Sequence, residues 1–155
     1  MHKIDYTPPE HFYMYPAPGP MSKSPLAKNA LSMTVFEEHA PFTDAPGAKE
    51  FIALYHERAA KAGIPDTNVE VQAAASYTAW QILEAGVRGA NSLDDKAIAN
   101  YIKTHKIDTI QGKLHFDGPS NYGDDLMRVK QVQNGRWVTV YPKEYAAPGA
   151  TLQVQ

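Results

Sequence analysis

The hydrophobic pattern changes its period between residues 105 and 112, and this change limits the folds open to the chain. Upstream of it, apolar residues recur at spacings of three and four, as on one face of a helix. From Lys113 to Phe116, apolar and polar residues alternate, as they do in a strand. Helix-length segments that lead into strand-length segments predict an α/β fold.

Composition narrows the classes of partner. The 155 residues suffice for one domain with a core, and folding a chain of this length buries roughly 70% of its extended surface. The formal charge of −2 argues against nucleic acid and anionic membrane as partners. No cysteine is present, so disulfides, thiolate nucleophiles and sulfur-ligated metals are excluded, and no cofactor is predicted.

Neither a signal nor a membrane span is predicted. The first twenty residues have no basic segment followed by an apolar core of about 7 to 15 residues. No run approaches the roughly 18 apolar residues of a transmembrane helix. If the chain is part of an exported protein, we expect its signal to lie upstream of Met1.

Two strands are predicted in the first quarter of the chain, with a loop between them. His11 to Pro16 is an aromatic run of strand length, bounded by prolines. Leu31 to Phe36 alternates as a second strand does. Between them, the prolines of Pro16 to Pro25 predict an extended loop without regular structure, because proline lacks an amide hydrogen and restricts φ.

Three helices follow, and their ends carry recognisable signals. Gly63, with Pro65 after it, predicts the end of the first helix. Thr67 and Glu70 have the spacing of a capping box for the second, which is apolar around most of its surface and is predicted to be largely buried. A similar capping pattern precedes the third. The predicted helices cover Pro46–Ala62, Val69–Ala90 and Lys96–His105.

A β-hairpin is predicted near the carboxyl end. Asn134-Gly135 is a strong signal for a type I′ turn, because both central residues need positive φ. A two-residue loop pairs Val132 with Trp137 and Val129 with Val140. One face of the hairpin, predicted to face the core, then carries Met127, Val129, Val138 and Val140. From Tyr145 to Gln155 no periodic pattern is evident.

The sequence does not predict catalysis. It lacks the glycine-rich phosphate loops, the nucleophile elbow and the paired histidines that mark common enzyme classes. Glu37-Glu38-His39 is the one acidic cluster with a histidine, and we interpret it as a solvated bend. Asp94-Asp95 complements a helix dipole, and Asp124-Asp125 is typical of a turn.

The order of these segments resembles a family of solute receptors. From about His2 to Pro142 the chain is similar to the extracytoplasmic substrate-binding proteins of ABC importers, of the type that binds the branched-chain amino acids Leu, Ile and Val. The helix with Tyr77, the Gly-x-Leu-x-Phe-Asp strand and the closing hairpin carry the likeness. The matching segments are His11–Pro20, Leu31–Phe42, Ala75–Ala79, Leu83–Gly86, Asp108–Asp117 and Gln131–Gly135.

The resemblance implies a partial type I periplasmic-binding-protein fold, the C-terminal part of two doubly wound lobes with the helices packed on parallel sheet. It divides the chain into the last strand and loop of the second lobe at 1–30, a hinge strand and helical part of the first lobe at 31–117, and a C-terminal hairpin and tail at 118–155. Complete receptors carry an entire first lobe and most of a second before this part.

The resemblance also implies a ligand site in the cleft between lobes. It suggests Tyr15, Gly19, Phe36 and Gln72 as ligand-binding residues. Each has a structural alternative: burial for Tyr15, a turn for Gly19, core packing for Phe36 and solvent exposure for Gln72. The loop at residues 15–20 lacks the acidic residue that often pairs a ligand ammonium, so a carboxylate or amide metabolite is as compatible as an amino acid.

The implied function is solute binding by hinge closure, without enzymatic activity, followed by docking on an ABC permease in the membrane. The implied location is the periplasm, if the chain is part of a longer precursor. Self-association through an uncovered lobe surface is a further expectation. Two alternatives remain open at this point: a ligand-sensing regulatory domain of the same fold, and a truncated fragment without independent activity.

Overall fold

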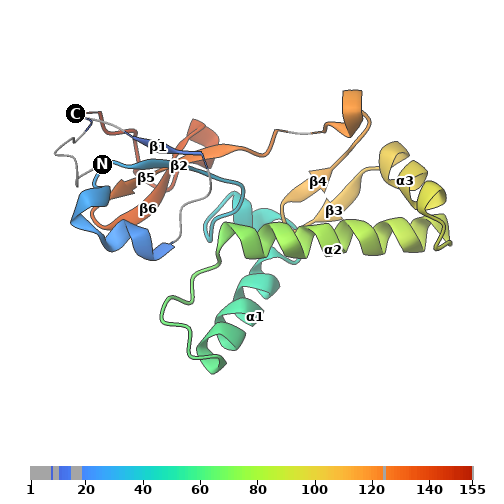
Figure 1. Ribbon diagram of the computed structural model, residues 1–155, viewed down its shortest axis with the longest axis horizontal. Helices are drawn as coiled ribbons and strands as arrows, with labels where there is room; N and C mark the ends of the chain where they lie inside the picture. Colours follow the sequence, from blue (N-terminus) through green and yellow to red (C-terminus); the bar gives the residue numbers. More distant parts are fainter. Residues whose placement is uncertain (1–7, 9–10, 15–18, 124, 155) are drawn as a thin grey trace. The chain divides into compact units, whose positions relative to one another are not determined.

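The computed structural model describes residues 8, 11–14, 19–123 and 125–154 and divides into two compact units. We call Met1–Thr34 with Met127–Gln155 the sheet unit, and Val35–Leu126 the helical unit. Figure 1 labels their helices and strands. The mixture of helices and sheets agrees with the predicted α/β class.

The sheet unit contains a four-stranded mixed sheet in the order β1-β2-β5-β6. Only β1 and β2 pair in parallel, whereas β5 is antiparallel to both of its neighbours. The expectation of helices on parallel sheet is wrong for the described part of the helical unit, whose strands β3 (Ile107–Thr109) and β4 (Gly112–Leu114) are adjacent in the chain and pair antiparallel. The strands are β1 (Phe12–Tyr13), β2 (Leu31–Thr34), β5 (Arg128–Gln133) and β6 (Arg136–Tyr141).

The predicted hairpin is present with one change of register. Asn134 and Gly135 have φ of 52° and 73°, as a type I′ turn requires, and Val132 pairs with Trp137 as predicted. A β-bulge beside Val129 then pairs this residue with Tyr141 instead of Val140. The bulge inserts one extra residue, Val140, on β6, and this residue is buried. The predicted core face is wrong at Met127, which precedes β5 and is 48% exposed.

Two glutamine side chains of β5 hold the carboxy-terminal tail. Gln131 is buried, its Nε2 donates to the Gln153 carbonyl at 2.7 Å, and its Oε1 accepts from the Gln153 amide at 2.9 Å. Gln133 Nε2 donates to the Thr151 carbonyl at 2.7 Å. The tail thus lacks a periodic pattern because side-chain amides, rather than a strand ladder, satisfy its backbone.

The proline-rich loop contains regular structure that the sequence analysis excluded. Two 3₁₀ helices, η2 (Gly19–Lys23) and η3 (Pro25–Ala27), follow residues 15–18, which lie outside the described residues. Proline is tolerated in a first helical turn, where its missing amide hydrogen has no partner to lose. Ser24 caps η3 by accepting from the Leu26 amide. The unit's core comprises Ala27, Ala30 and Val132, with Tyr13, Met21 and Trp137 packed against it.

The helical unit contains three α-helices and a small antiparallel β3–β4 hairpin. Figure 1 shows α1 crossing the amino-terminal half of α2, and α3 folded back along its other end. The α-helices and strands are α1 (Ala48–Lys61), α2 (Val71–Ala90), α3 (Asp95–Thr104), β3 (Ile107–Thr109) and β4 (Gly112–Leu114). The shorter 3₁₀ helices are η4 (Phe42–Asp44) and η5 (Pro119–Asn121) here, and η6 (Lys143–Tyr145) in the sheet unit.

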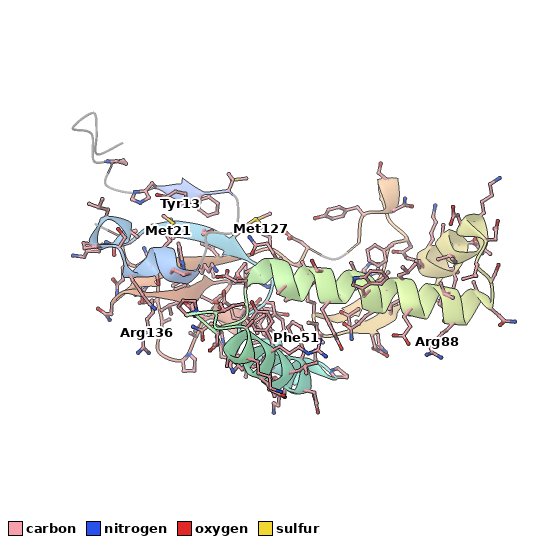
Figure 2. The ribbon with its side chains drawn as sticks, turned by 60° about the horizontal axis from the view of Figure 1, so that its bottom comes forward. Tyr13, Met21, Phe51, Arg88, Met127 and Arg136 are labelled. Atoms are coloured by element: carbon pink, nitrogen blue, oxygen red, sulfur yellow. The ribbon has the colours of Figure 1, made fainter. Side chains whose placement is uncertain are left out.

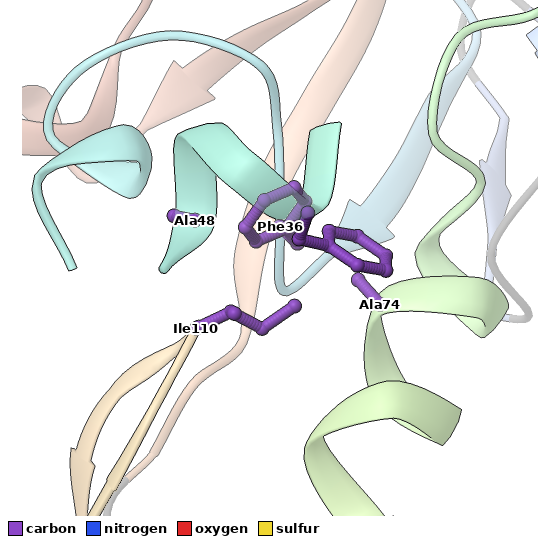
Figure 3. Close-up of a cluster of buried hydrophobic side chains, with 5 residues drawn as sticks. Phe36, Ala48, Ala74 and Ile110 are labelled. Carbon is purple, nitrogen blue, oxygen red and sulfur yellow. The ribbon is translucent and has the colours of Figure 1, made fainter. Parts of the chain in front are cut away.

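The core of this unit joins four segments. Phe36 from the chain after β2, Ala48 and Phe51 from α1, Ala74 from α2 and Ile110 from the β3–β4 turn form one buried cluster (Figure 3). The Phe36 ring meets Phe51 edge to face, with centroids 5.9 Å apart. Because the five side chains come from different segments, their burial fixes the packing of α1, α2 and the hairpin together.

The end of α1 follows the predicted signal, and the starts of α2 and α3 do not. Gly63 adopts φ of 70° just beyond α1, which confirms it as the helix end. Asp94 caps α3 by accepting from the Ala97 amide at 2.9 Å, whereas the predicted capping pattern consisted of Ser92 and Asp95. Glu70 is itself the N-cap residue of α2, with no side-chain capping bond. The predicted capping box is therefore wrong, because the helix begins at Val71 rather than at residue 69.

A distant carboxylate takes the place of that box. Glu38 Oε1 accepts from the Val69 amide beside the start of α2, and Oε2 lies 2.9 Å from Nε2 of His56 on α1. The Glu38 side chain is 24% exposed. The interpretation of Glu37-Glu38-His39 as a solvated bend is thus wrong at Glu38, whose carboxylate connects α1 to the α2 entrance.

Glycines let α3 approach α2 closely. A Cβ at Gly86 would lie 2.9 Å from Ile102 Cδ1, and one at Gly89 would collide with the Tyr101 ring. Both contacts are too short for a real side chain. The helix pair therefore depends on the absence of side chains at these positions.

We predict that Gly89→Ala destabilises the chain. Alanine favours a helix by about 0.5–1 kcal/mol over glycine, but overpacking costs about 1–3 kcal/mol. Because the overpacking cost is larger, the collision with Tyr101 should lower the free energy of unfolding. In a Tyr101→Ala background, the same substitution should stabilise. Urea unfolding of the four variants measures both effects, and stabilisation by Gly89→Ala in both backgrounds contradicts the packing.

We also predict that Glu38→Ala lowers the free energy of unfolding by about 1–3 kcal/mol, because it leaves the partly buried Val69 amide without its acceptor. Glu38→Gln keeps one oxygen and should cost less. Glu57→Ala is the control, since Glu57 is 58% exposed and pairs only with Lys61 on the surface. Equal losses for Glu38→Ala and Glu57→Ala in urea unfolding would rule out the proposed connection.

Candidate functional site

The structure distributes the predicted ligand residues over both units. Gly19 begins η2 in the sheet unit, where its carbonyl accepts from Ser22 Oγ at 2.8 Å. Gln72 is exposed in the first turn of α2, and Phe36 is 1% exposed in the core of the helical unit. Tyr15 lies outside the described residues. These residues form no single site within either unit, and the Phe36 ring offers no exposed face to a ligand here.

The helical unit has an apolar hollow between α1 and α2, which we call the α1–α2 groove. Its volume is about 370 Å³, within the usual range for a small-molecule pocket. Figure 2 shows Phe51 where the two helices meet. The residues that line the groove are Phe51, Leu54, Tyr55, Arg58, Ala59, Ala62, Ile64 and Tyr77.

Helical spacing explains why these side chains share one side of α1. Phe51, Tyr55 and Arg58 lie three or four positions apart, so they project in one direction. Tyr77 of α2 closes the wall, with its ring centroid 4.6 Å from that of Phe51. Leu54 and Ile64 are 39% and 46% exposed, so apolar surface is open to a ligand.

Arg58 is the one charged residue among those that line the groove. No carboxylate of the described chain lies within ion-pair distance of it. A guanidinium presents a fixed fork of donors that matches a carboxylate. A flat or branched apolar body against the aromatic wall, with its carboxylate on Arg58, is the chemistry this arrangement can bind.

A second hollow of about 340 Å³ lies between α3 and the segment after β4. It combines the Lys103 side chain and two asparagines with only one aromatic ring, that of Phe116. Without an aromatic wall it offers less for an apolar ligand to stack on. The α1–α2 groove is therefore the better candidate.

The described residues contain no cluster of three or more His, Asp or Glu side chains that could hold a metal ion. No helix within the described ranges is long and apolar enough to cross a bilayer.

The sequence analysis predicted a helix over this segment but did not identify Phe51, Leu54, Tyr55 or Arg58 as candidate site residues. One signal was available: Arg58 interrupts a face that is otherwise apolar and aromatic. What spacing could not show is that α2 leaves this face partly open, since that depends on the angle at which the two helices cross.

Comparison with known proteins gives likenesses in structure only. No protein-family profile matches the chain, and no curated protein sequence does. Among solved structures, a leucine-binding protein from Thermotoga maritima matches with a TM-score of 0.60 and 23% identity over 75% of this chain. An ABC transporter substrate-binding protein from Desulfitobacterium hafniense, in complex with Leu, matches with a TM-score of 0.56 and 17% identity over 74%.

A solute-binding protein of an ABC transporter from Rhodopseudomonas palustris, in complex with benzoate, matches with a TM-score of 0.54 and 14% identity over 75% of this chain. The matches cover 31%, 32% and 30% of those three chains, so this chain spans about a third of their length. All three are solute receptors of one architecture. The chain therefore has a partial type I periplasmic-binding-protein fold, that of the substrate-binding proteins of ABC transporters.

Proposed function

We propose that the chain is part of the extracytoplasmic solute-binding component of an ABC importer, and that it binds a small carboxylate with an apolar body. The observation that carries this proposal is the structural match of about three quarters of the chain to several such receptors. In a longer precursor the receptor would work in the periplasm and deliver its ligand to a membrane permease.

The ligand class is supported by chemistry at two levels. The ligands named for two similar receptors, Leu and benzoate, both combine a carboxylate with an apolar body. In this chain, the Arg58 guanidinium matches the carboxylate of such a ligand, and the aromatic wall of the α1–α2 groove matches its apolar body. No carboxylate lines the groove, so a ligand ammonium would have no negative partner there. An aromatic or aliphatic carboxylate without an amino group therefore fits better than a free amino acid.

The proposed mechanism is hinge closure around the ligand. β2 would act as the hinge strand, and Tyr15, Gly19 and Gln72 stay predictions for contacts made when the receptor closes. Phe36 would support the site from the core rather than touch the ligand, since its ring packs on Phe51 of the groove wall. Closure would shift the population toward a form that the permease recognises.

We predict that benzoate raises the melting temperature of the 155-residue chain, whereas benzamide, of the same shape without the charge, does not. At a concentration of 100 Kd a ligand stabilises by about 2.7 kcal/mol. This corresponds to a rise of about 5–10 °C for a chain of this size. Leucine, tested in parallel, should raise it less than benzoate, because its ammonium lacks a partner in the groove.

Arg58→Gln should abolish the difference between benzoate and benzamide. Lys61→Gln is the matched control, because Lys61 lies on the same helix and pairs with Glu57 on the surface. If Arg58→Gln keeps the response to benzoate, the site lies outside the groove. If no carboxylate or amide in a broad panel raises the melting temperature, the proposal that the chain binds solutes is wrong.

A further inference from the structure

One face of α2 carries large apolar side chains that are partly or largely exposed, although Tyr77 also packs on Phe51 in the α1–α2 groove. Tyr77, Trp80 and Leu83 are 40%, 71% and 42% exposed, although the sequence predicted a largely buried helix. Trp80 projects about 160° away from Thr78, which is 4% exposed on the inner face. That prediction is wrong because, within the described helical unit, the only strands are β3 and β4, of three residues each. We call Tyr77, Trp80 and Leu83 the α2 stripe.

We propose that a second copy of this chain covers the α2 stripe in an antiparallel, two-fold symmetric α2–α2 contact. α2 spans Val71–Ala90, so Trp80 lies at its midpoint. A two-fold axis at this point sets Trp80 against Trp80 of the partner subunit. It also sets Tyr77 against Leu83 of the partner subunit, so every large side chain of the α2 stripe meets an apolar one. Such a self-complementary patch is what a two-fold interface requires.

The charges beside the α2 stripe select the antiparallel direction. Glu84 and Arg88 form an exposed ion pair at 2.9 Å, and Figure 2 shows Arg88 towards the far end of α2. In the antiparallel arrangement, Glu84 faces Ser76 and Arg88 faces Gln72 of the other copy. A parallel arrangement in register would set Glu84 on Glu84 and Arg88 on Arg88, and like charges at a contact are unfavourable.

The size of the surface favours a weak dimer. The three side chains leave roughly 350 Å² exposed in each copy, judged from the usual area of aromatic residues. With the small residues beside them, two copies would bury roughly 1,000 Å² in total, near the lower limit for a specific interface. Ala73, about 20° from Trp80 around the helix, adds little bulk beside the contact.

Sedimentation velocity across a range of micromolar concentrations tests the dimer. The chain should pass from monomer to dimer as its concentration rises, and Trp80→Glu should raise the dissociation constant at least roughly 30-fold. Leu93→Glu is the control, because Leu93 is 83% exposed in the same unit but lies outside the α2 stripe. Far-UV circular dichroism of each variant confirms that it is folded.

Cross-linking tests the register independently of Trp80. The chain has no cysteine, so an introduced cysteine is the single thiol of each variant chain and any disulfide must join the introduced positions. A mixture of Ser76→Cys and Glu84→Cys chains should form a disulfide-linked heterodimer. Either variant by itself should not, since eight helical residues separate the two positions by about 12 Å and a disulfide needs Cα atoms within about 7 Å.

Homodimers of each single variant would indicate the parallel arrangement and overturn the proposal. A monomer at every concentration, with no cross-link in the mixture, would also overturn the proposal. The α2 stripe would then be a surface that another part of a longer polypeptide covers. Because neither readout uses a ligand, failure here is distinct from failure of solute binding.

Discussion

The burial of Phe36 is the contact on which the helical unit depends. Phe36 packs with residues of α1, α2 and the β3–β4 turn in one cluster. Three-residue strands cannot hold these helices by hydrogen bonding alone, so the cluster packs α1, α2 and the hairpin together. Removing a buried phenylalanine costs about 3–5 kcal/mol. That is a large part of the 5–15 kcal/mol that stabilises a typical domain.

The elements that depend on neighbouring residues could be predicted from the sequence. The end of α1 and the β5–β6 turn lie where Gly63 and Asn134-Gly135 predicted them, because a positive φ angle is a local property. The start of α2 could not be predicted, since its acceptor is Glu38, 31 residues upstream of the Val69 amide. The bulge beside Val129 could not be predicted either, because pairing residues by their distance from the turn assumes a regular ladder.

The candidate site was predictable only in its chemistry. Arg58 among apolar residues could be read from the spacing, but the opening of the groove depends on how α2 packs on α1. The family resemblance led to Phe36 as a possible ligand contact, and the structure places it in the core. For α2 the sequence predicted burial, and the structure shows exposed apolar side chains. Periodicity shows that a helix face is apolar enough to be buried, but only the structure shows whether another element covers it.

The attachment of the tail by Gln131 has a consequence for the ageing of the protein. Its amide both donates to and accepts from the backbone of Gln153. Deamidation would replace the donating nitrogen by oxygen, so a carboxylate would face a carbonyl in a buried position, where an uncompensated charge is costly. A single hydrolysis in storage would therefore loosen the tail at Gln153 without cutting the backbone, while Gln133 still holds Thr151.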